Sequence, residues 1–354
     1  MSFLQKLYAH VSNDIGIDLG TANSLVYLRG KGVIIHEPSV VALNQKTGQV
    51  VAVGRQAKDM LGRTPQHIRA VRPLVNGVVS DFEVTEEMLR YFLNKAQQGT
   101  RALVGPRVVI GVPSGITNVE SRAVRDAARN AGAREVYIVE EPIAAAIGMR
   151  LPIHEAHANM VVDIGGGTTD IAVLALNGLV KSKNLHVAGD RLNADIIAHL
   201  RNEFKIVIGE TTAEDLKFAV CSVLEHDTPL EAPVRGRDLV TGLPKEVIIT
   251  DEDVRDAVGV SIDTIIEAIR AVLEESPPMV VSDIMQVGIH LTGGGALIQG
   301  VPELLKAMLE LPVNVANDPL TSVVRGTGAI VENLATYREL LLDEDVLPAF
   351  EHVT

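Results

Sequence analysis

Two short segments of the sequence place an aspartate, a glycine and several small residues directly after an apolar stretch. They are Asp18-Leu-Gly-Thr-Ala-Asn-Ser24 and Asp163-Ile-Gly-Gly-Gly-Thr-Thr169. A tight turn of small residues directs successive backbone N–H groups toward one point, where they bind phosphate oxygens without a side-chain charge. The residues in position to do so are Thr21, Ala22 and Asn23 in the first segment and Gly165, Gly166, Gly167 and Thr168 in the second.

Asp18 and Asp163 predict a metal site between these two segments. Each aspartate stands at the carboxyl end of a strand-like run, so we expect the two to face the same cleft. Mg²⁺ prefers carboxylates, water molecules and phosphate oxygens as ligands. The pair would therefore hold a hydrated Mg²⁺ beside a bound phosphate chain.

The surroundings of the two aspartates repeat as well. Asp163 follows Asp18 by 145 residues, and in both copies a hydroxyl residue six places after the aspartate, Ser24 or Thr169, begins the next strand-like run. One such turn on its own is common after a strand. Two copies at matching phase indicate an internal duplication.

A third glycine-rich loop and one charged pair are candidates for contacts with adenosine. Gly293, Gly294, Gly295, Ala296 and Leu297 follow an apolar run and offer bare backbone for close approach, although glycine also serves in ordinary caps and turns. Glu214 and Lys217 are three residues apart on one predicted helical face, so they could reach a ribose and a base together. A solvent-exposed salt bridge is the alternative for that pair.

Glu141 is the candidate for catalysis. It precedes Pro142 at a predicted strand-to-helix junction, where a carboxylate can face a cleft and orient a water molecule for attack on a γ-phosphate. The alternative is an acid favoured by the helix macrodipole, an explanation that also suits Glu140.

Other nucleotide-binding signatures are absent from the sequence. No G-x-x-x-x-G-K-[ST] occurs, and Gly326-Thr-Gly328 does not extend to G-x-G-x-x-G because residue 331 is valine. These absences argue against P-loop and dinucleotide-binding proteins.

Composition predicts a two-domain α/β protein. The chain has 354 residues, 47% hydrophobic, with 3% aromatics and no tryptophan, so its core must consist of Val, Ile, Leu and Ala, which suits parallel sheets covered by helices. The net charge of −13 argues against binding of nucleic acid, and the single cysteine, Cys221, fits a reducing cytoplasm. We find neither a signal peptide nor an apolar run near the roughly 20 residues that cross a bilayer.

The local patterns predict strands and helices in alternation. Capping boxes at Thr117 and Thr211 and a start near Thr250 mark three helices, a helix follows Thr85, and a last helix is interrupted around Pro302. Pro142 suits the first position of the helix that follows Glu140, and the alanines after it allow close packing. Strand-like runs cover residues 15–19, 25–28, 33–35, 40–43, 50–53, 107–112, 136–139, 160–164, 171–174 and 289–291.

These residues and several further segments resemble the actin, Hsp70 and sugar-kinase superfamily and, within it, the MreB family of bacterial actins. The segments cover nearly the whole chain, at residues 14–23, 37–43, 61–65, 112–117, 141–148, 162–169, 208–214, 277–278 and 291–297. The resemblance implies a duplicated actin-like ATPase fold, with two RNase H-like domains, each with a smaller subdomain, and ATP in the cleft between them. Domain I would span 1–154 plus roughly 320–354, with its small subdomain at about 33–76, and domain II 155–319, with its small subdomain at about 187–249.

The resemblance also implies roles for the candidate residues. Asp18 and Asp163 would position Mg²⁺ through water, and Glu141 would be the hydrolytic glutamate of a slow ATPase. Contacts with adenosine would come from Glu214, Asp215, Leu216, Lys217 and residues 293–297. Two departures concern this side of the cleft, since Phe218-Ala-Val-Cys-Ser-Val223 replaces usually charged residues and a glycine, and Asn193 replaces a usual acid.

A cytoskeletal role on the inner membrane face follows from the same resemblance. The family forms paired, antiparallel protofilaments that guide wall synthesis with MreC, MreD, RodZ and RodA, and Val119 matches a contact between protofilaments. Leu103 and Val104 match a membrane-binding loop, for which a packed turn is the alternative. An amphipathic N-terminal stripe with Phe3, Leu4 and Leu7 is the second membrane candidate.

Three other functions compete on the same fold. A chaperone-type ATPase needs a peptide-binding domain, whereas this sequence ends soon after the third glycine loop. A sugar or acetate kinase needs an acceptor pocket and a base, and we find no such constellation. A scaffold without hydrolysis remains open if Glu141 is not positioned for attack.

Overall fold

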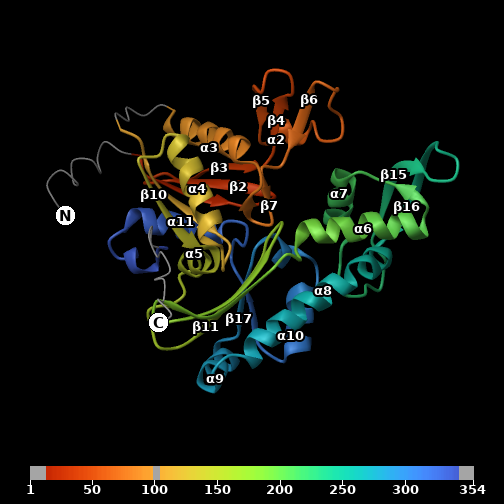
Figure 1. Cartoon of the computed structure of the whole chain (residues 1–354). Helices are drawn as coiled ribbons and strands as arrows, with labels where there is room; N and C mark the ends of the chain where they lie inside the picture. The colour runs from red at the N-terminus through yellow and green to blue at the C-terminus, as the bar shows by residue number, and fades with distance from the viewer. Residues whose placement is uncertain (1–12, 99–103, 343–354) are drawn as a thin grey trace, which may run out of the picture.

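The computed structural model describes residues 13–98 and 104–342 as two halves, one drawn mostly red to yellow and the other mostly green to blue (Figure 1). Each half is built on a five-stranded sheet, and both sheets run in the same order of third, second, first, fourth and fifth strand. The first contains β1 (Ile15–Leu19), β2 (Asn23–Leu28), β3 (Gly32–Pro38), β9 (Arg107–Val112) and β10 (Glu135–Glu140). The second contains β11 (Asn159–Ile164), β12 (Thr169–Ala175), β13 (Gly178–Leu185), β17 (Ile289–Thr292) and β18 (Val313–Val315).

The strand pairing confirms the internal duplication. In both sheets the first strand pairs antiparallel with the second and parallel with the fourth. Asp18 stands opposite Leu25 in β2, and Asp163 stands opposite Asp170 in β12, so the register repeats at the same offset as the sequence. All six residues of β11 are buried, as expected of a central strand covered on both faces.

Nine α-helices longer than four residues lie among the described residues, in agreement with the predicted α/β class. The first sheet carries α3 (Phe82–Gln97), α4 (Asn118–Asn130), α5 (Glu141–Gly148) and α11 (Ser322–Glu332). The second half contains α6 (Gly189–Glu203), α7 (Glu210–Val220), α8 (Asp251–Glu274), α9 (Pro278–Val287) and α10 (Val301–Leu309). A short 3-10 helix, η1 (Gly294–Leu297), follows β17, and η2 (Arg338–Leu340) lies near the end of the described chain.

Helices α5 and α11 pack closely at the centre of the molecule. All eight residues of α5 are buried, and a Cβ on Gly326 of α11 would lie 1.7 Å from the carbonyl oxygen of Ala144. Only small residues permit this approach, which confirms the predicted packing role of the alanine run. Helix α5 also contacts β11 and β12, so it lies between the two sheets.

Three smaller sheets extend from the halves. One is formed by β4 (Val41–Asn44), β5 (Val50–Val53) and β6 (Ile68–Val71), beside the short helix α2 (Arg55–Lys58). The next is formed by β14 (Ile206–Val207), β15 (Glu231–Asp238) and β16 (Pro244–Thr250), and the last is the hairpin of β7 (Leu74–Val75) and β8 (Val78–Val79). The first two fall within the ranges predicted for the small subdomains, while the domain boundaries themselves stay a prediction.

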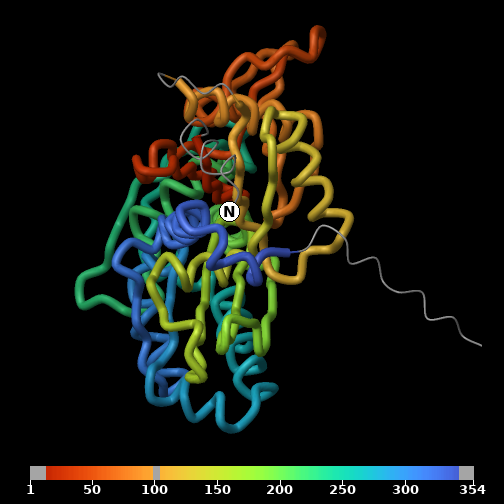
Figure 2. The backbone as a smooth tube through the Cα atoms, turned by 90° about the vertical axis from the view of Figure 1, so that its left-hand side faces the viewer, coloured from red at the N-terminus to blue at the C-terminus, as the bar shows by residue number. Residues whose placement is uncertain are grey.

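The chain returns to the first half near its end. Helix α11, drawn blue, contacts β1, β9 and α5, and Leu342 bridges to Ile138 of β10 (Figure 2). Two segments therefore connect the halves, at residues 149–158 and 316–321. In the described ranges no helix is long and apolar enough to cross a membrane.

Several local predictions need correction. The capping box at Thr117 is present, but helix α7 begins at Glu210 after Gly209, so Thr211 lies inside the helix and caps nothing. Helix α3 begins at Phe82, capped by Asp81, and Thr85 is a buried residue of its second turn. Pro302 does not interrupt a helix, because α10 starts at Val301 and proline is tolerated in the first turn. Pro142 likewise occupies the second position of α5.

Candidate functional site

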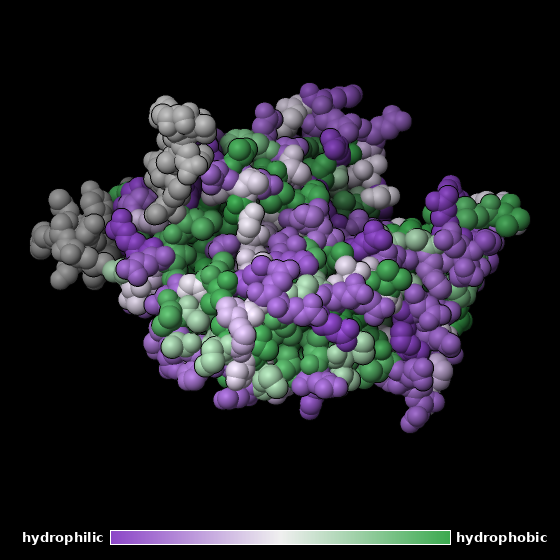
Figure 3. Space-filling model, turned by 60° about the horizontal axis from the view of Figure 1, so that its bottom comes forward, coloured by the Kyte–Doolittle hydropathy of each residue, from purple (hydrophilic) through white to green (hydrophobic). Residues whose placement is uncertain are grey.

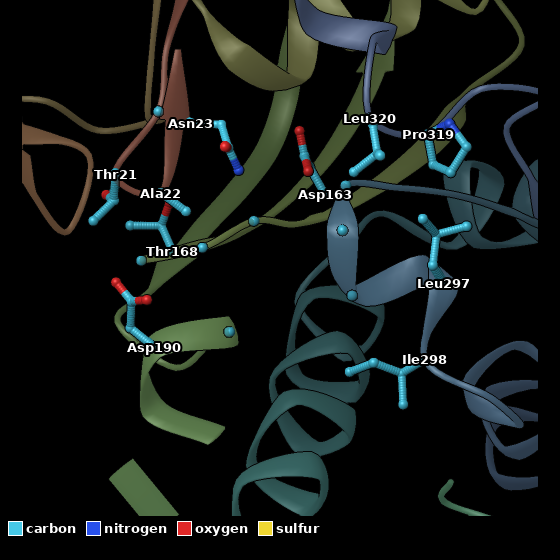
Figure 4. Close-up of a pocket in the computed structure, with 18 of the residues that line it drawn as sticks. Thr21, Ala22, Asn23, Asp163, Thr168, Asp190, Leu297, Ile298, Pro319 and Leu320 are labelled. Carbon is cyan, nitrogen blue, oxygen red and sulfur yellow. The ribbon is translucent and has the colours of Figure 1, made fainter. Parts of the chain in front are cut away.

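A cavity of about 510 Å³ lies between the two halves and contains parts of all three predicted loops. Figure 4 shows Thr21, Ala22, Asn23 and Thr168 on one side of it and Leu297, Ile298, Pro319 and Leu320 on the other, with Asp163 between them. The cavity thus has a polar end of backbone turns and an apolar end. Its size suits a small-molecule ligand with both kinds of group.

The two aspartate hairpins touch each other at the polar end. A Cβ on Gly166 would lie 2.5 Å from Cβ of Ala22, and a Cβ on Gly167 would lie 2.5 Å from Oγ1 of Thr21. Any side chain at these two glycines would force the turns apart. The glycines therefore permit both sets of backbone N–H groups to face one small volume.

The hydroxyl residue that repeats in the two hairpins anchors each of them. Ser24 hydrogen-bonds Ser39 at 2.8 Å, and the Ser39 hydroxyl donates to the carbonyl of Gly20 at 2.6 Å. In the second copy the Thr169 hydroxyl donates to the carbonyl of Val187 at 2.7 Å. The duplicated pattern thus encodes an equivalent side-chain brace in both halves.

Helix α6 holds the second hairpin through its first turn. The backbone N–H of Gly189 donates to the carbonyl of Gly165 at 3.2 Å, and that of Asp190 donates to the carbonyl of Gly166 at 2.7 Å. Lys217 of α7 donates to the carbonyl of Gly189 at 2.9 Å. The first two bonds engage the carbonyl groups of Gly165 and Gly166 in the turn, and the third holds the start of α6 in place.

The third loop packs directly on the strand that carries Asp163. Gly293 has φ 81°, and a Cβ there would lie 2.3 Å from Oδ1 of Asp163. A Cβ on Gly295 would lie 2.2 Å from the side chain of Ile164. Glycine is required at both positions because the loop backbone lies against the end of β11.

Four carboxylates gather at the base of the cavity. Asp18, Glu141 and Asp163 line it, and Asp170 is the cross-strand neighbour of Asp163. Burial raises the pKa of Asp18 to about 7. Burial first, and then the charges of Asp170 and Asp18, raise the pKa of Asp163 well above its ordinary value. Glu141 is raised well above its ordinary pKa by burial first, followed by the charges of Asp170, Asp18 and Asp163.

Asp170 is fixed in place by hydrogen bonds from both halves. It accepts from the backbone N–H of Ser114 at 2.8 Å, the Ser114 hydroxyl at 2.6 Å and the Asn184 amide at 2.9 Å. Burial nevertheless raises its pKa, since the loss of hydration outweighs these bonds. The sequence reasoning missed this residue, and its only signal was an acid two residues into a predicted buried strand.

The carboxylates fit a hydrated cation. In the described part of the chain, no three His, Cys, Asp or Glu side chains are placed to ligate one metal ion directly. Mg²⁺ commonly keeps several of its water molecules, and carboxylates at a distance can bind those. Accumulated negative charge with raised pKa values is what a nearby cation would relieve.

Ion pairs join the halves across the opening of the cavity. Lys58 of α2 pairs with Glu214 of α7. Arg72 pairs with Glu210 and approaches Asp190 at 3.8 Å. Glu214 lines the cavity as predicted, but its carboxylate pairs with Lys58 of the opposite half. Neither the adenosine contact nor the salt bridge with Lys217 that the sequence suggested included this lysine.

A sequence profile of MreB/Mbl proteins matches residues 12–339. The chain belongs to the MreB/Mbl family. It is 46% identical over 324 residues to the cell shape-determining protein Mbl of Bacillus subtilis (strain 168), which covers 91% of this chain and 97% of that protein. It is 45% identical over 346 residues to the cell shape-determining protein MreB of Escherichia coli (strain K12), covering 97% and 100%. The resemblance seen in the sequence is confirmed, and the role of the chain is that of a bacterial actin-like cytoskeletal protein.

Solved structures confirm the duplicated actin-like fold of this MreB/Mbl-family chain. MreB5 of Spiroplasma citri bound to AMPPNP superimposes with a TM-score of 0.86 at 36% identity, covering 93% of this chain and 98% of that one. The same protein bound to ADP gives a TM-score of 0.87. A MamK double helical filament gives 0.77 at 24% identity and supports the fold alone.

Most residues predicted for the MreB/Mbl site line the cavity, and three do not. Leu216 is buried in the core of the second half, and Asp215 lies on the exposed face of α7. Ala296 is buried behind the third loop. The side of α7 that faces the cavity is instead formed by Glu214, Lys217, Phe218 and Ala219, and Cys221 lines the cavity from just after the helix.

The predicted surface residues are only partly described. Val119 lies on α4 with 79% of its surface exposed, and Val104 is half-buried in a bend. Phe3, Leu4, Leu7 and Leu103 lie outside the described residues.

Sequence reasoning also missed the apolar end of the cavity. Pro319 and Leu320 line it from the segment between β18 and α11, and Phe218 lines it from α7. Pro319 and Leu320 belong to no phosphate signature, so no local pattern marked them, and Phe218 stood out only as part of a departure from the family.

Proposed function

We propose that this protein is an ATP-dependent bacterial actin that polymerises into membrane-associated filaments and directs cell-wall synthesis and rod cell shape. The observation that carries the proposal is the contact of the two duplicated hairpins, at Ala22 and Gly166, beside one cavity. The MreB5 structures with AMPPNP and ADP support adenine nucleotides as the ligand class.

The proposed nucleotide lies with its phosphates at the polar end and its adenosine at the apolar end. The N–H groups of Thr21, Ala22 and Asn23 and of residues 165–168 bind the phosphate oxygens. The third loop, Lys217 and Glu214 contact the adenosine. The apolar side chains of Leu297, Ile298 and Leu320 at that end of the cavity support this orientation (Figure 4).

Asp18, Asp163 and Glu141 form the proposed hydrolytic centre. Mg²⁺, when bound, neutralises charge on the phosphates. Asp18 and Asp163 would hold it through water, and its charge would lower their pKa values and that of Glu141, so that Glu141 is ionised. Glu141 orients the attacking water molecule and holds its proton, and hydrolysis is slow and coupled to filament assembly.

Self-association is supported by apolar side chains on the surface. Val119 on α4 is 79% exposed and Met279 on α9 is 77% exposed, so both are available for a contact between copies of the chain. Apolar patches lie between hydrophilic side chains over the face shown in Figure 3. We infer paired, antiparallel protofilaments with Val119 at the contact between them.

Membrane and partner binding complete the proposal. Phe3, Leu4, Leu7, Leu103 and Val104 would bind the inner face of the cell membrane, each weakly, with the filament multiplying the effect. The filament would guide a wall-synthesis complex of the MreC, MreD, RodZ and RodA type. The predicted domains, 1–154 with 320–354 and 155–319, are the units that would close on the nucleotide.

Pelleting tests the polymer and the membrane contacts separately. Purified protein should sediment with ATP and Mg²⁺ and not without nucleotide, and it should sediment with liposomes. Protein that binds ATP but stays in the supernatant under every condition would contradict the filament proposal. The double change Leu103→Ser and Val104→Ser should abolish co-sedimentation with liposomes, and persistent binding would leave the N-terminal stripe as the membrane contact.

A further inference from the structure

A second cavity, of about 370 Å³, shares a wall with the nucleotide cavity. Its lining includes Arg150, His290, Asn317, Ser322 and Arg325. The chain from β18 to the start of α11 contributes to both cavities, since residues 314–318 line the second and Pro319 and Leu320 line the first.

This second cavity lies where the chain passes between the halves. Residues 148–151 end α5 and begin one connection, and residues 314–318 begin the other. Ser322 and Arg325 belong to the first turns of α11, which packs against α5 (Figure 1). A ligand here would contact both connections at once.

In the part of the chain that the structure describes, the lining of the second cavity carries two arginines without ion pairs and one buried ring nitrogen without a hydrogen-bond partner. Arg150 and Arg325 form no ion pair within the described residues, although the chain as a whole carries a net charge of −13. Nε2 of His290 is buried and has no hydrogen-bond partner. The cavity's acid is Asp318, whose carboxylate accepts a hydrogen bond from the Thr321 hydroxyl at 2.6 Å.

One backbone feature adds to the attraction for an anion, and a second marks Arg150 as an unusual residue at its position. Helix α11 has no side-chain cap at its N-terminus, so its first N–H groups keep the positive end of the helix dipole free. Arg150 has φ 61°, a left-handed conformation that ordinarily selects glycine or asparagine after a helix. An arginine at this position is therefore unexpected from backbone preference alone.

We propose that the second cavity binds a small anion through a phosphate group. Two guanidinium groups suit paired phosphate oxygens because each offers parallel N–H donors. The α11 N-terminus supplies further donors, and Nε2 of His290 donates in the tautomer that carries the proton there. The site is separate from the ATP phosphates, and its shared segment couples occupancy of one cavity to the other. By linkage, an anion that changes nucleotide affinity must be changed in its own affinity by the same factor.

The test uses inorganic phosphate as the probe and the full chain saturated with ADP and Mg²⁺, so that the nucleotide cavity is already occupied. Binding is followed by ³¹P NMR line broadening at constant ionic strength. Wild type should bind phosphate, and the double variant Arg150→Gln with Arg325→Gln should bind at least about tenfold more weakly, since charge-assisted hydrogen bonds are lost. Arg63→Gln is the matched control, an exposed arginine in the turn between α2 and β6, and should bind like wild type.

Equal phosphate binding by wild type and the double variant would overturn the proposal, and so would absence of saturable binding to wild type. Should the double variant fail to fold, the single change Arg150→Gln at an exposed position provides the same comparison. If the chain binds no ADP, the nucleotide proposal fails by itself, and the difference between wild type and variant still decides the second cavity.

Discussion

The carboxylates under the nucleotide cavity should make the nucleotide-free protein less stable as the pH rises through neutrality. Burial raises the pKa of Asp18 from 3.8 to about 7. Between these values the folded protein keeps a proton that the unfolded chain has lost, so the free energy of unfolding decreases as the pH rises. Below the pKa that Asp18 has in the unfolded chain, no stability is lost in this way. Above its pKa in the folded protein, the loss of stability is complete.

The size of the effect follows from the difference between the two pKa values. A difference of about three between the two pKa values lowers the free energy of unfolding by about 4 kcal/mol, because one pKa unit corresponds to about 1.36 kcal/mol. Asp18 keeps part of its surface open to the cavity, so about 4 kcal/mol is an upper limit. Most of this loss of stability occurs at pH values around the pI of about 5.3, where proteins tend to precipitate. The remaining change between about pH 6 and about pH 8 is about 1 kcal/mol.

Urea unfolding of nucleotide-free protein in EDTA measures this change. The stability gained by Asp18→Asn relative to wild type should increase with pH by about 1 kcal/mol over that range. Asp263→Asn, at an exposed position on α8, is the control and should show a difference that does not vary with pH. An Asp18→Asn difference that is flat or that shrinks with rising pH would refute the reasoning about the buried carboxylates.

Three further predictions concern the cavity. Gly166→Ala should weaken ATP binding at least about tenfold, because its Cβ would lie 2.5 Å from the first hairpin, whereas Gly259→Ala has open space on a helix and should bind ATP normally. Unchanged affinity in a nucleotide titration of Gly166→Ala would contradict the contact. Glu141→Ala should retain ATP binding and lose phosphate release, and normal turnover would remove Glu141 from the mechanism. Lys58→Gln should release bound nucleotide a few-fold faster in a stopped-flow chase because its ion pair with Glu214 closes the cavity opening; an identical rate would show that the pair restrains nothing.

The sequence predicts the hairpins well because their determinants are local. A buried strand, an aspartate and a turn of small residues define β1 and β11 within about ten positions, and the repeat fixes their equivalence. The capping box at Thr117 succeeds for the same reason, since both of its hydrogen bonds span three residues. At Thr211 the same pattern fails because Gly209 already occupies the N-cap and the helix begins at Glu210.

Contacts between distant segments could not be predicted in this way. Asp170 becomes a fourth carboxylate of the site only because β12 folds back beside Asp163 and Ser114 approaches from the other half. The pair of Lys58 with Glu214 joins residues 156 positions apart. No periodicity marks either partner, so such contacts depend on how the two halves pack.

Electron microscopy of the protein with ATP and Mg²⁺ on a lipid monolayer tests the central claim most directly. We expect paired filaments on the lipid with ATP. We expect none with Gly166→Ala, because its Cβ would force the two hairpins apart. Filaments that form equally well without nucleotide, or with Gly166→Ala, would contradict a polymer driven by ATP bound between the duplicated hairpins.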